Sequence, residues 1–589
     1  MSQSFPQRRA RMEYVCMNCG HRHPVDQLLY TCPDCGGVLL LEDLDFDEMK
    51  EKGAQYWRDL FDARRATRTT ALRGIFRFYE LMAPVLEEED IVYLGEGDTP
   101  IIEASAALQK HVGRRFAYKN DGMNPSASFK DRGMAGAYSY LKSLVRKNGW
   151  DEVLTICAST GDTSAAAAMY GAYVGDPIRT VVLLPHGKVT PAQLAQPLGS
   201  GAQVLEVPGV FDDCMKVVEY LADHYRVALL NSKNSWRVLG QESYAYEAAQ
   251  WYDWKMGDKA LFMPIGNAGN ITSMISACLK MFRLGIIEEL PHIVGVQTHH
   301  ADPVWRYYSQ PRESRVYETV KVKPSVAQAA MIGAPVSFPR VKNLVDKYEA
   351  LGGRFDVVQV TEQSIMDSMI LVNRFGNIAC TQGGESFAGM LKAQVLGLLR
   401  NDEFCILDST AHALKFAGFQ NMYFEDSFPA EYGVKARPEL VNHPRLLLTA
   451  DERAAMPAED FTRAAAEAVA QARRRGVAVY NETCPQYLFL NGDDNRHSDE
   501  PWRYILQPPL RKLEDNAGLC QAVKSGDVDM IITDHCAYTR QQKENAPTGT
   551  PGGLPGLETL LVLTAAIPDM TWCDVARVLA ENPARIYGL

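Results

Sequence analysis

The sequence predicts an α/β protein built around a parallel β-sheet. Short runs rich in β-branched and aliphatic residues precede helical segments between residues 115 and 300, and the alternation returns between residues 355 and 425. Strands that alternate with helices form parallel sheets with helices on both faces. The four clearest runs are VLTICAS (153–159), VVLLP (181–185), QVLEV (203–207) and ALFMPIG (260–266).

Residues 1–45 form a cysteine-bearing module ahead of this pattern. Two CxxC pairs, Cys16 with Cys19 and Cys32 with Cys35, could supply the four thiolates of a tetrahedral zinc site. The alternatives are two disulfides, which a reducing compartment disfavours, or four unrelated thiols. We therefore expect a zinc ribbon. Such ribbons can also dock nucleic acid, but the net charge of −11 favours a structural role without a nucleic-acid partner.

Residues 46–85 are predicted to be helical and are followed by the glycine-rich turn VYLGEGDTP. The expected apolar anchors of this segment are Trp57, Leu60, Phe61, Leu72, Ile75 and Phe76.

Two later turns are rich in small residues, STGDTSAAAA (159–168) and GNAGNITS (266–273). Small residues let backbone N–H groups point at an anion, and a following helix adds its dipole. The second turn follows an apolar strand and opens a helix, so we expect residues 266–270 to hold a phosphate. The first turn could hold a carboxylate in the same way, or it could be an ordinary helix cap.

Lys130 lies in the run NPSASFKDRG, whose Asn-Pro-Ser start suggests a constrained turn. A lysine that forms a Schiff base must be held rigidly and must reach into a cleft. Spacing alone does not distinguish such a lysine from a solvated charge.

Seven strings in order over roughly residues 90–450 carry a resemblance to a known family. Together they resemble the fold-type II pyridoxal-phosphate enzymes, whose fold is that of the tryptophan synthase β-subunit, and within them the threonine synthases. The order of the set is what makes the resemblance specific. The strings are GEGDTP, NPSASFKDRG, ASTGDTSAA, NSWRVLGQES, PIGNAGNIT, NIACTQGGES and DSTAHALK.

The resemblance implies a role for each matching residue. Lys130 would bind the aldehyde of pyridoxal 5′-phosphate, Thr410 would face the pyridine nitrogen, and Asp162 would stand beside the 3-hydroxyl, where many relatives carry asparagine and others aspartate. The cofactor phosphate would rest on Gly266, Asn267, Ala268, Gly269 and Asn270. The substrate would be held by Ser159, Thr160 and Thr163 at its carboxylate and by Arg237 and Lys188 at its phosphate.

The implied activity is that of a lyase of threonine biosynthesis, which converts O-phospho-L-homoserine and water to L-threonine and phosphate. A second interpretation keeps the cofactor and changes the substrate to phosphoserine, as in cysteate synthase. A third treats the chain as a non-enzymatic zinc-ribbon scaffold.

The carboxy-terminal part of the chain changes in character. We expect catalytic residues 46–450 to form two α/β subdomains and residues 451–474 a helical linker, with Thr449 and Glu452 as a capping box. Residues 475–589 resemble the cyclic amidohydrolases, such as dihydropyrimidinase and dihydroorotase. The matching strings are RGVAVYNETCPQYLFL, YILQPPLR, DVDMIITDHCAYT, PGGLPGLET and ENPARIYGL.

This last segment matches only the final part of the amidohydrolase barrel. Of that family's metal ligands only Asp534 is present, and one carboxylate cannot build a dinuclear site. We expect an inactive, partial TIM-barrel-like appendage in which Asp534 and His535 are structural. The alternative is one half of a split amidohydrolase that another chain completes.

Composition limits the remaining possibilities. The chain is 46% hydrophobic and 23% charged, and no apolar run approaches the ~20 residues that span a membrane. The basic N-terminus has no apolar segment behind it and is not a secretory signal. We expect a cytoplasmic homo-oligomer that binds a small phosphorylated amino acid and no membrane.

Overall fold

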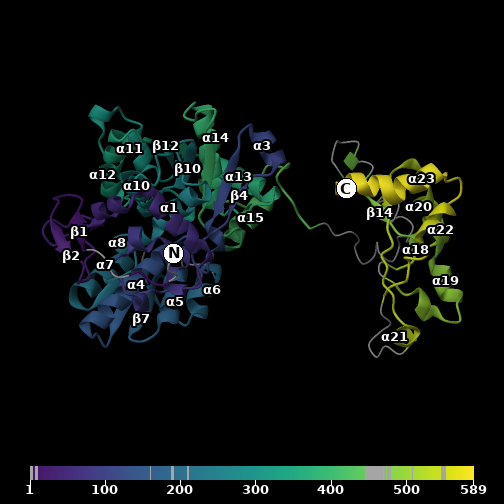
Figure 1. Cartoon of the computed structure of the whole chain (residues 1–589), viewed down its shortest axis with the longest axis horizontal. Helices are drawn as coiled ribbons and strands as arrows, with labels where there is room; N and C mark the ends of the chain where they lie inside the picture. The colour runs from purple at the N-terminus through teal and green to yellow at the C-terminus, as the bar shows by residue number, and fades with distance from the viewer. Residues whose placement is uncertain are drawn as a thin grey trace. The chain divides into compact units, whose positions relative to one another are not determined.

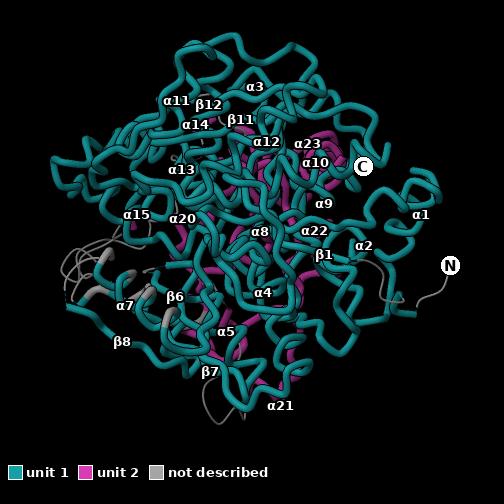
Figure 2. The backbone as a smooth tube through the Cα atoms, turned by 90° about the vertical axis from the view of Figure 1, so that its left-hand side faces the viewer, with its two compact units in different colours: residues 1–443 teal, residues 444–589 magenta. Residues whose placement is uncertain are grey.

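The computed structural model describes residues 4–6, 11–159, 161–186, 191–208, 211–444, 469, 472–473, 479–506, 509–544 and 552–588. The chain divides into two compact units, Met1–His443 and Pro444–Leu589 (Figures 1 and 2). Thr449, Glu452 and all but three residues of the expected linker lie outside the described residues. Among the described helices, none combines the length and apolar character that a membrane crossing requires.

A six-stranded sheet forms the centre of the first unit, in the order β12-β11-β10-β13-β5-β4. The first five strands are parallel, and β4 pairs antiparallel with β5 at the edge. The strands are β4 (Ile101–Glu103), β5 (Phe116–Asn120), β10 (Lys259–Pro264), β11 (His292–Thr298), β12 (Arg354–Val360) and β13 (Phe404–Ser409).

Both faces of this sheet are buried, as the alternation of strands and helices predicts. Along β10, Leu261 and Met263 join one apolar cluster, while Phe262 between them joins another. Helices α10 (Gly269–Arg283) and α12 (Phe338–Ala350) supply the first cluster, and α13 (Glu362–Arg374) and α14 (Thr381–Val395) supply the second. Successive strand side chains point to opposite faces, so an apolar run of this kind fits a doubly covered strand.

A smaller, wholly parallel sheet has the order β8-β7-β6-β9. Its strands are β6 (Val153–Ala158), β7 (Ile178–Pro185), β8 (Gln203–Val207) and β9 (Val227–Leu229). The helices that accompany it are α4 (Lys130–Asn148), α5 (Asp162–Val174), α6 (Pro191–Gly199) and α7 (Phe211–His224). The four strands predicted from the sequence are therefore present as β6, β7, β8 and β10.

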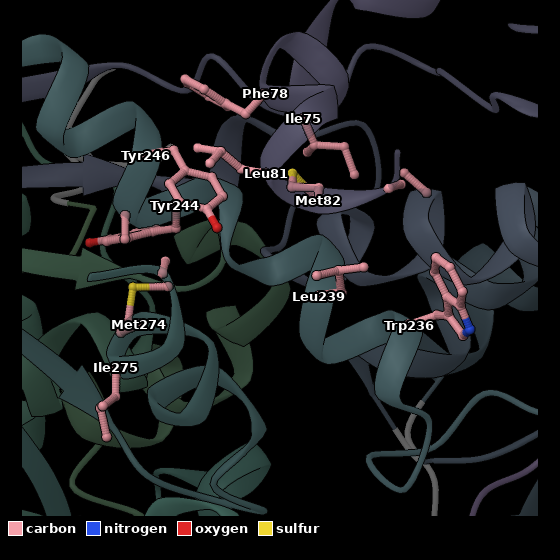
Figure 3. Packing of buried hydrophobic residues seen from close by; sticks show 14 of the residues in the cluster. Ile75, Phe78, Leu81, Met82, Trp236, Leu239, Tyr244, Tyr246, Met274 and Ile275 are labelled. Atoms are coloured by element: carbon pink, nitrogen blue, oxygen red, sulfur yellow. The ribbon is translucent and has the colours of Figure 1, made fainter. Parts of the chain in front are cut away.

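The expected helical segment at 46–85 is broken rather than continuous. It forms α1 (Ala54–Ala63), the single turn α2 (Tyr79–Met82) and several 3-10 turns. Gly74 has a φ of 56°, and a Cβ there would lie 2.2 Å from the carbonyl oxygen of Glu96, so a regular helix cannot pass through it. All six predicted apolar anchors are nevertheless buried. Figure 3 shows Ile75 of this segment in one apolar cluster with Trp236 and Met274.

Two helices of the first unit approach each other closely because glycines face the contact. A Cβ on Gly240 of α8 (Ser235–Gln241) would lie 2.1 Å from the carbonyl oxygen of Arg132 in α4. A Cβ on Gly136 of α4 would lie 2.7 Å from the carbonyl oxygen of Trp236 in α8. No larger residue fits at either position without moving a helix backbone.

The remaining elements of the first unit surround these sheets. An antiparallel three-stranded sheet of order β2-β1-β3 carries the cysteine module. Its strands are β1 (Met12–Cys16), β2 (Arg22–Pro24) and β3 (Leu39–Asp43), and the further helices are α3 (Ala106–Val112), α9 (Ser243–Trp251), α11 (Pro303–Tyr308) and α15 (Ala417–Phe424).

In its described residues the second unit has two short parallel strands, β14 (Glu482–Thr483) and β15 (Met530–Ile531), with helices around them. A small apolar cluster that includes Leu488, Val523 and Ile531 forms its core. The helices are α18 (Pro485–Phe489), α19 (Gly492–His497), α20 (Leu513–Ser525), α21 (Arg540–Glu544), α22 (Leu560–Ala565), α23 (Trp572–Ala576) and α24 (Asn582–Tyr587).

We predict that the first unit folds without the second, because residues 1–443 form a compact unit with large apolar clusters of their own. In a chain that ends at His443, this unit should unfold within about 2 °C of the temperature at which it unfolds in the full chain, as measured by calorimetry. A chain that ends at Leu396 loses β13, an interior strand between β10 and β5, and should not unfold cooperatively. A drop of about 10 °C or more in the chain ending at His443 would contradict the prediction.

Candidate active site

A cavity in the first unit lies where strands of both sheets end. β10 ends at Pro264, its neighbour β13 ends at Ser409, and β6 ends shortly before Asp162. Carboxyl ends of parallel strands are the usual place for ligand sites in open α/β sheets. The described lining residues are Phe129, Lys130, Asp162, Ser232, Arg237, Val238, Gln241, Pro264, Gly266, Asn267, Ala268, Gly269, Asn270, Ala329, Ala330, Gln382 and Thr410.

Lys130 is the first residue of α4, and the turn before it is fixed to the segment that carries Thr410. The backbone N–H of Phe129 donates to the Thr410 carbonyl at 2.8 Å, and that of His412 donates to the Ala127 carbonyl at 3.0 Å. The Lys130 amine lies 4.1 Å from the centre of the Phe129 ring. Burial, and then the charge of Arg237, lower the pKa of Lys130 to about 8. The backbone that leads into Lys130 is thus fixed, and the lowered pKa leaves part of the amine unprotonated near neutral pH.

The turn at residues 266–270 joins β10 to α10. Ala268 has a φ of 61°, a left-handed conformation that opens the helix at Gly269. A Cβ on Gly266 would lie 2.9 Å from the carbonyl oxygen of Ala329, so only glycine allows the opposite loop to come this close. Residues 266–270 line the cavity at the amino terminus of a 15-residue helix, where free backbone N–H groups and the helix dipole suit a phosphate.

Arg237 is buried in α8, and no carboxylate among the described residues forms a salt bridge with it. Its Nη1 donates to the Leu230 carbonyl at 2.7 Å, while its Nε has no hydrogen-bond partner in the described part of the chain. Burial lowers the pKa of Arg237 to about 10. A buried guanidinium without a compensating anion is costly, and its planar fork binds phosphate or carboxylate in a bidentate manner. The cavity therefore offers a place for an anion beside Arg237.

Asp162 and Thr410 complete the predicted lining. Asp162 is the first residue of α5, and its Oδ1 lies 2.9 Å from the amine of Lys415. The Thr410 hydroxyl lies 3.4 Å from the Cys380 thiol. Both residues are about 5% exposed, so their polar atoms depend on partners inside the protein.

A buried ion network lies around Arg132, two residues after Lys130. Arg132 contacts Asp121 at 2.7 Å and Glu247 at 2.8 Å, and Lys119 contacts Glu247 at 2.7 Å. The Thr99 hydroxyl donates to Asp121 at 2.7 Å. The Arg132 and Lys119 charges lower the pKa of Glu247, although burial opposes this change. The network joins the GEGDTP turn, β5, α9 and the start of α4.

Not every predicted site residue reaches the cavity. Lys130, Asp162, Arg237, Thr410 and residues 266–270 lie together in its lining. Ser159 and Thr163 are described but do not line it; the Ser159 hydroxyl accepts a hydrogen bond from the Gly161 N–H at 3.3 Å. Thr160 and Lys188 lie outside the described residues.

Sequence reasoning missed three polar lining residues, Ser232, Gln241 and Gln382. The Oε1 of Gln241 and the Nε2 of Gln382 are buried without a hydrogen-bond partner, so each can bind a ligand atom. Both glutamines lie inside strings that the sequence had already singled out, NSWRVLGQES and NIACTQGGES. Their position in these strings could have marked the two glutamines as candidate site residues.

The four cysteines of the amino-terminal module lie together. The Cys16 and Cys35 sulfurs are 3.4 Å apart and those of Cys19 and Cys32 are 3.7 Å apart. All four sulfurs lie within 4.8 Å of one another. With Zn–S bonds of about 2.3 Å, tetrahedral thiolates are separated by about 3.8 Å, so the four side chains fit a zinc ion.

The candidate metal-ligand groups among the described residues all lie in the first unit. In the second unit, Asp534 has a φ of 39°, and the Nδ1 of His535 accepts hydrogen bonds from the Gly556 and Leu557 N–H groups, both at 3.2 Å. His535 therefore fixes a loop through this nitrogen.

Comparisons with known proteins agree with this geometry. Residues 92–409 match the family described as "Pyridoxal-phosphate dependent enzyme". The chain is 34% identical over 402 residues to the threonine synthase of Methanocaldococcus jannaschii, covering 68% of this chain and 92% of that protein. It is 31% identical over 401 residues to the chloroplastic threonine synthase 2 of Arabidopsis thaliana, covering 67% and 74%.

Solved structures show the same fold. The crystal structure of threonine synthase from Escherichia coli matches with a TM-score of 0.51 at 18% identity, over 75% of this chain and 94% of that one. The yeast threonine synthase matches with a TM-score of 0.50 at 19% identity, over 72% and 95%. The chain therefore belongs to the pyridoxal-phosphate-dependent enzymes, in the threonine synthase family.

Proposed function

We propose that this chain is a pyridoxal-phosphate-dependent threonine synthase, a lyase that converts O-phospho-L-homoserine and water to L-threonine and phosphate. The observation that supports the proposal is one cavity lined by a buried amine, a glycine-rich turn at a helix amino terminus, and a buried arginine that has no carboxylate partner among the described residues. Two relatives that are named threonine synthases support the same activity, and this chain matches most of the length of each.

The lining residues fit the cofactor. Residues 266–270 would hold its phosphate, Lys130 would bind its aldehyde, and Asp162 and Thr410 would face its ring. Pyridoxal phosphate supplies an electron-withdrawing ring that stabilises negative charge at the substrate's carbon atoms. Thr410 presents a hydroxyl, which cannot protonate a ring nitrogen as a carboxylic acid would. This favours elimination and replacement over transamination.

The residues of the chain would carry out the proton transfers and hold the leaving group. Once the substrate amine has taken its place at the aldehyde, the freed amine of Lys130 would take the proton from the substrate α-carbon and later move a proton at the β-carbon. Arg237 would hold the phosphate that leaves the γ-carbon, with help from Lys188. Ser159, Thr160 and Thr163 would hold the substrate carboxylate, and water adds at the β-carbon.

Lys130 should react with the cofactor aldehyde only as the free amine, so the rate of pyridoxal phosphate addition to apoprotein should depend on pH. Below a pKa of about 8 the amine is increasingly protonated, and the rate should fall about tenfold per pH unit. Stopped-flow absorbance measures this rate. Lys130→Ala should show no borohydride-stable cofactor at any pH and no turnover. A rate midpoint near the unshifted lysine pKa, or activity in the variant, would refute the assignment.

Arg237 should contribute to binding of the substrate much more than to binding of the cofactor. Arg237→Gln should raise the KM for O-phospho-L-homoserine by about 10- to 100-fold, because a charged hydrogen bond to phosphate is lost. The Kd for pyridoxal phosphate should change by less than about threefold. Arg237→Lys keeps the charge without the planar fork and should give an intermediate KM.

Equal losses of cofactor and substrate affinity would mean that Arg237 is structural. Phosphate release from O-phospho-L-serine alone would replace the proposed substrate with that of a cysteate-synthase-like enzyme.

The four-cysteine module is proposed to hold a structural zinc ion. Its support is the close approach of Cys16, Cys19, Cys32 and Cys35. Purified protein should contain about one zinc per chain by mass spectrometry, and Cys19→Ser should lose most of it. Cys573→Ser, a change at an exposed cysteine of the second unit, should leave the zinc content intact. Full zinc content in Cys19→Ser would exclude the site.

For the second unit we propose an inactive remnant of an amidohydrolase-like barrel that takes no part in the chemistry. The two short parallel strands with surrounding helices are compatible with part of such a barrel. The backbone contacts of His535 support a structural role for that residue. We further propose that the protein works in the cytoplasm as a homo-oligomer on a small phosphorylated amino acid.

A further inference from the structure

The cavity is suited to anions, yet a carboxylate lines it. Among the described lining residues Asp162 is the only acidic one, while Lys130 and Arg237 are cations. Asp162 is about 5% exposed, so water screens its charge poorly. A bare carboxylate there would repel a phosphate-bearing ligand through a low-dielectric medium.

Lys415, which is not a lining residue, provides the compensating charge. Its amine lies 2.9 Å from Asp162 Oδ1 and donates to the Ser126 carbonyl, also at 2.9 Å. The Lys415 side chain is 18% exposed, so the pair is largely removed from water. The charge of Asp162 acts on Lys130, and the charges of both Lys415 and Asp162 act on Asp131. Lys415 thus connects the segment of Thr410, the start of α5 and the turn before Lys130.

The chemistry of the cofactor gives this pair a role. In pyridoxal phosphate the phenolic hydroxyl is on the ring carbon next to the aldehyde-bearing carbon. A cofactor joined to Lys130, with its phosphate at residues 266–270, therefore has this hydroxyl close to the lysine. Asp162 is the acidic group of the lining that can accept its hydrogen bond, and an ion-paired carboxylate can do so without adding net negative charge.

We propose that Lys415 is a positioning residue for the cofactor: it directs Asp162 toward the phenolic hydroxyl and cancels the charge of that carboxylate in the anion-binding cavity. The inference rests on the proposed function, because it requires pyridoxal phosphate in this cavity. In this proposal the ion pair of Lys415 and Asp162 orients the cofactor in addition to stabilising the local backbone.

A double-mutant cycle tests the proposal in the full-length protein. Apoproteins of the natural chain, Lys415→Met, Asp162→Asn and the double variant are titrated with pyridoxal phosphate, and the Kd and the visible absorption band are recorded at pH 7. Lys415→Met should weaken cofactor binding by about tenfold or more, because it leaves Asp162 unpaired. Relative to Asp162→Asn alone, adding Lys415→Met should cost no more than about threefold, because asparagine carries no charge that needs compensation.

Two further variants control for charge and folding. Lys435→Met removes an exposed lysine and should leave both the Kd and the band unchanged. Lys415→Arg keeps the cation and should restore binding to within about threefold of the natural chain. If Lys415→Met does not fold, as judged by circular dichroism, Lys415→Gln takes its place in the cycle.

The proposal is overturned if loss of Lys415 weakens cofactor binding equally with aspartate and with asparagine at position 162. Such additivity would mean that Lys415 acts only through the Ser126 carbonyl. An unchanged Kd in Lys415→Met overturns it as well. If the natural chain itself fails to bind pyridoxal phosphate at Lys130, the proposed function fails instead, and the two failures are therefore distinguishable.

Discussion

The buried ion network around Arg132 is the constraint on which the geometry of the cavity depends. Arg132 is fully buried and contacts Asp121 and Glu247, which belong to different parts of the chain. Removing any one partner would leave an uncompensated charge away from water, which costs several kcal/mol. Because Arg132 is two residues beyond Lys130, the network fixes the first turn of α4 and therefore the starting point of the lysine side chain.

The contact between α4 and α8 extends this constraint across the cavity. Lys130 begins one helix and Arg237 lies in the other, and Gly136 and Gly240 allow the two backbones to touch. Packed interiors resist small displacements, so direct contact between α4 and α8 fixes the separation of the backbones that carry Lys130 and Arg237. A reaction at a substrate α-carbon with departure of a phosphate needs such a fixed separation.

Much of this arrangement could be predicted from the sequence, and the missing parts have physical reasons. The strands followed from apolar runs, and Lys130, Asp162, Arg237 and Thr410 followed from ordered strings. Gln241 and Gln382 required knowledge of which side chains end in the cavity without partners, a property of the folded structure. Lys415 could not be assigned either, because its pairing with Asp162 joins residues more than 250 positions apart. The break in the segment before residue 80 depends on the approach of Glu96 to Gly74, which local propensity does not encode.

The buried positive charges of the cavity suit it to bind both an anionic cofactor and an anionic substrate. Burial lowers the pKa of both Lys130 and Arg237, so part of their charge is destabilised before any ligand arrives. In the proposed site, an arriving phosphate would relieve this cost at Arg237, whereas Lys130 would supply free amine for covalent chemistry. The same burial would make Asp162 an obstacle if Lys415 did not pair with it. Under the proposed function, desolvation would thus give the three lining residues different tasks. Arg237 would bind an anion and Lys130 an aldehyde, while Asp162 is paired with Lys415.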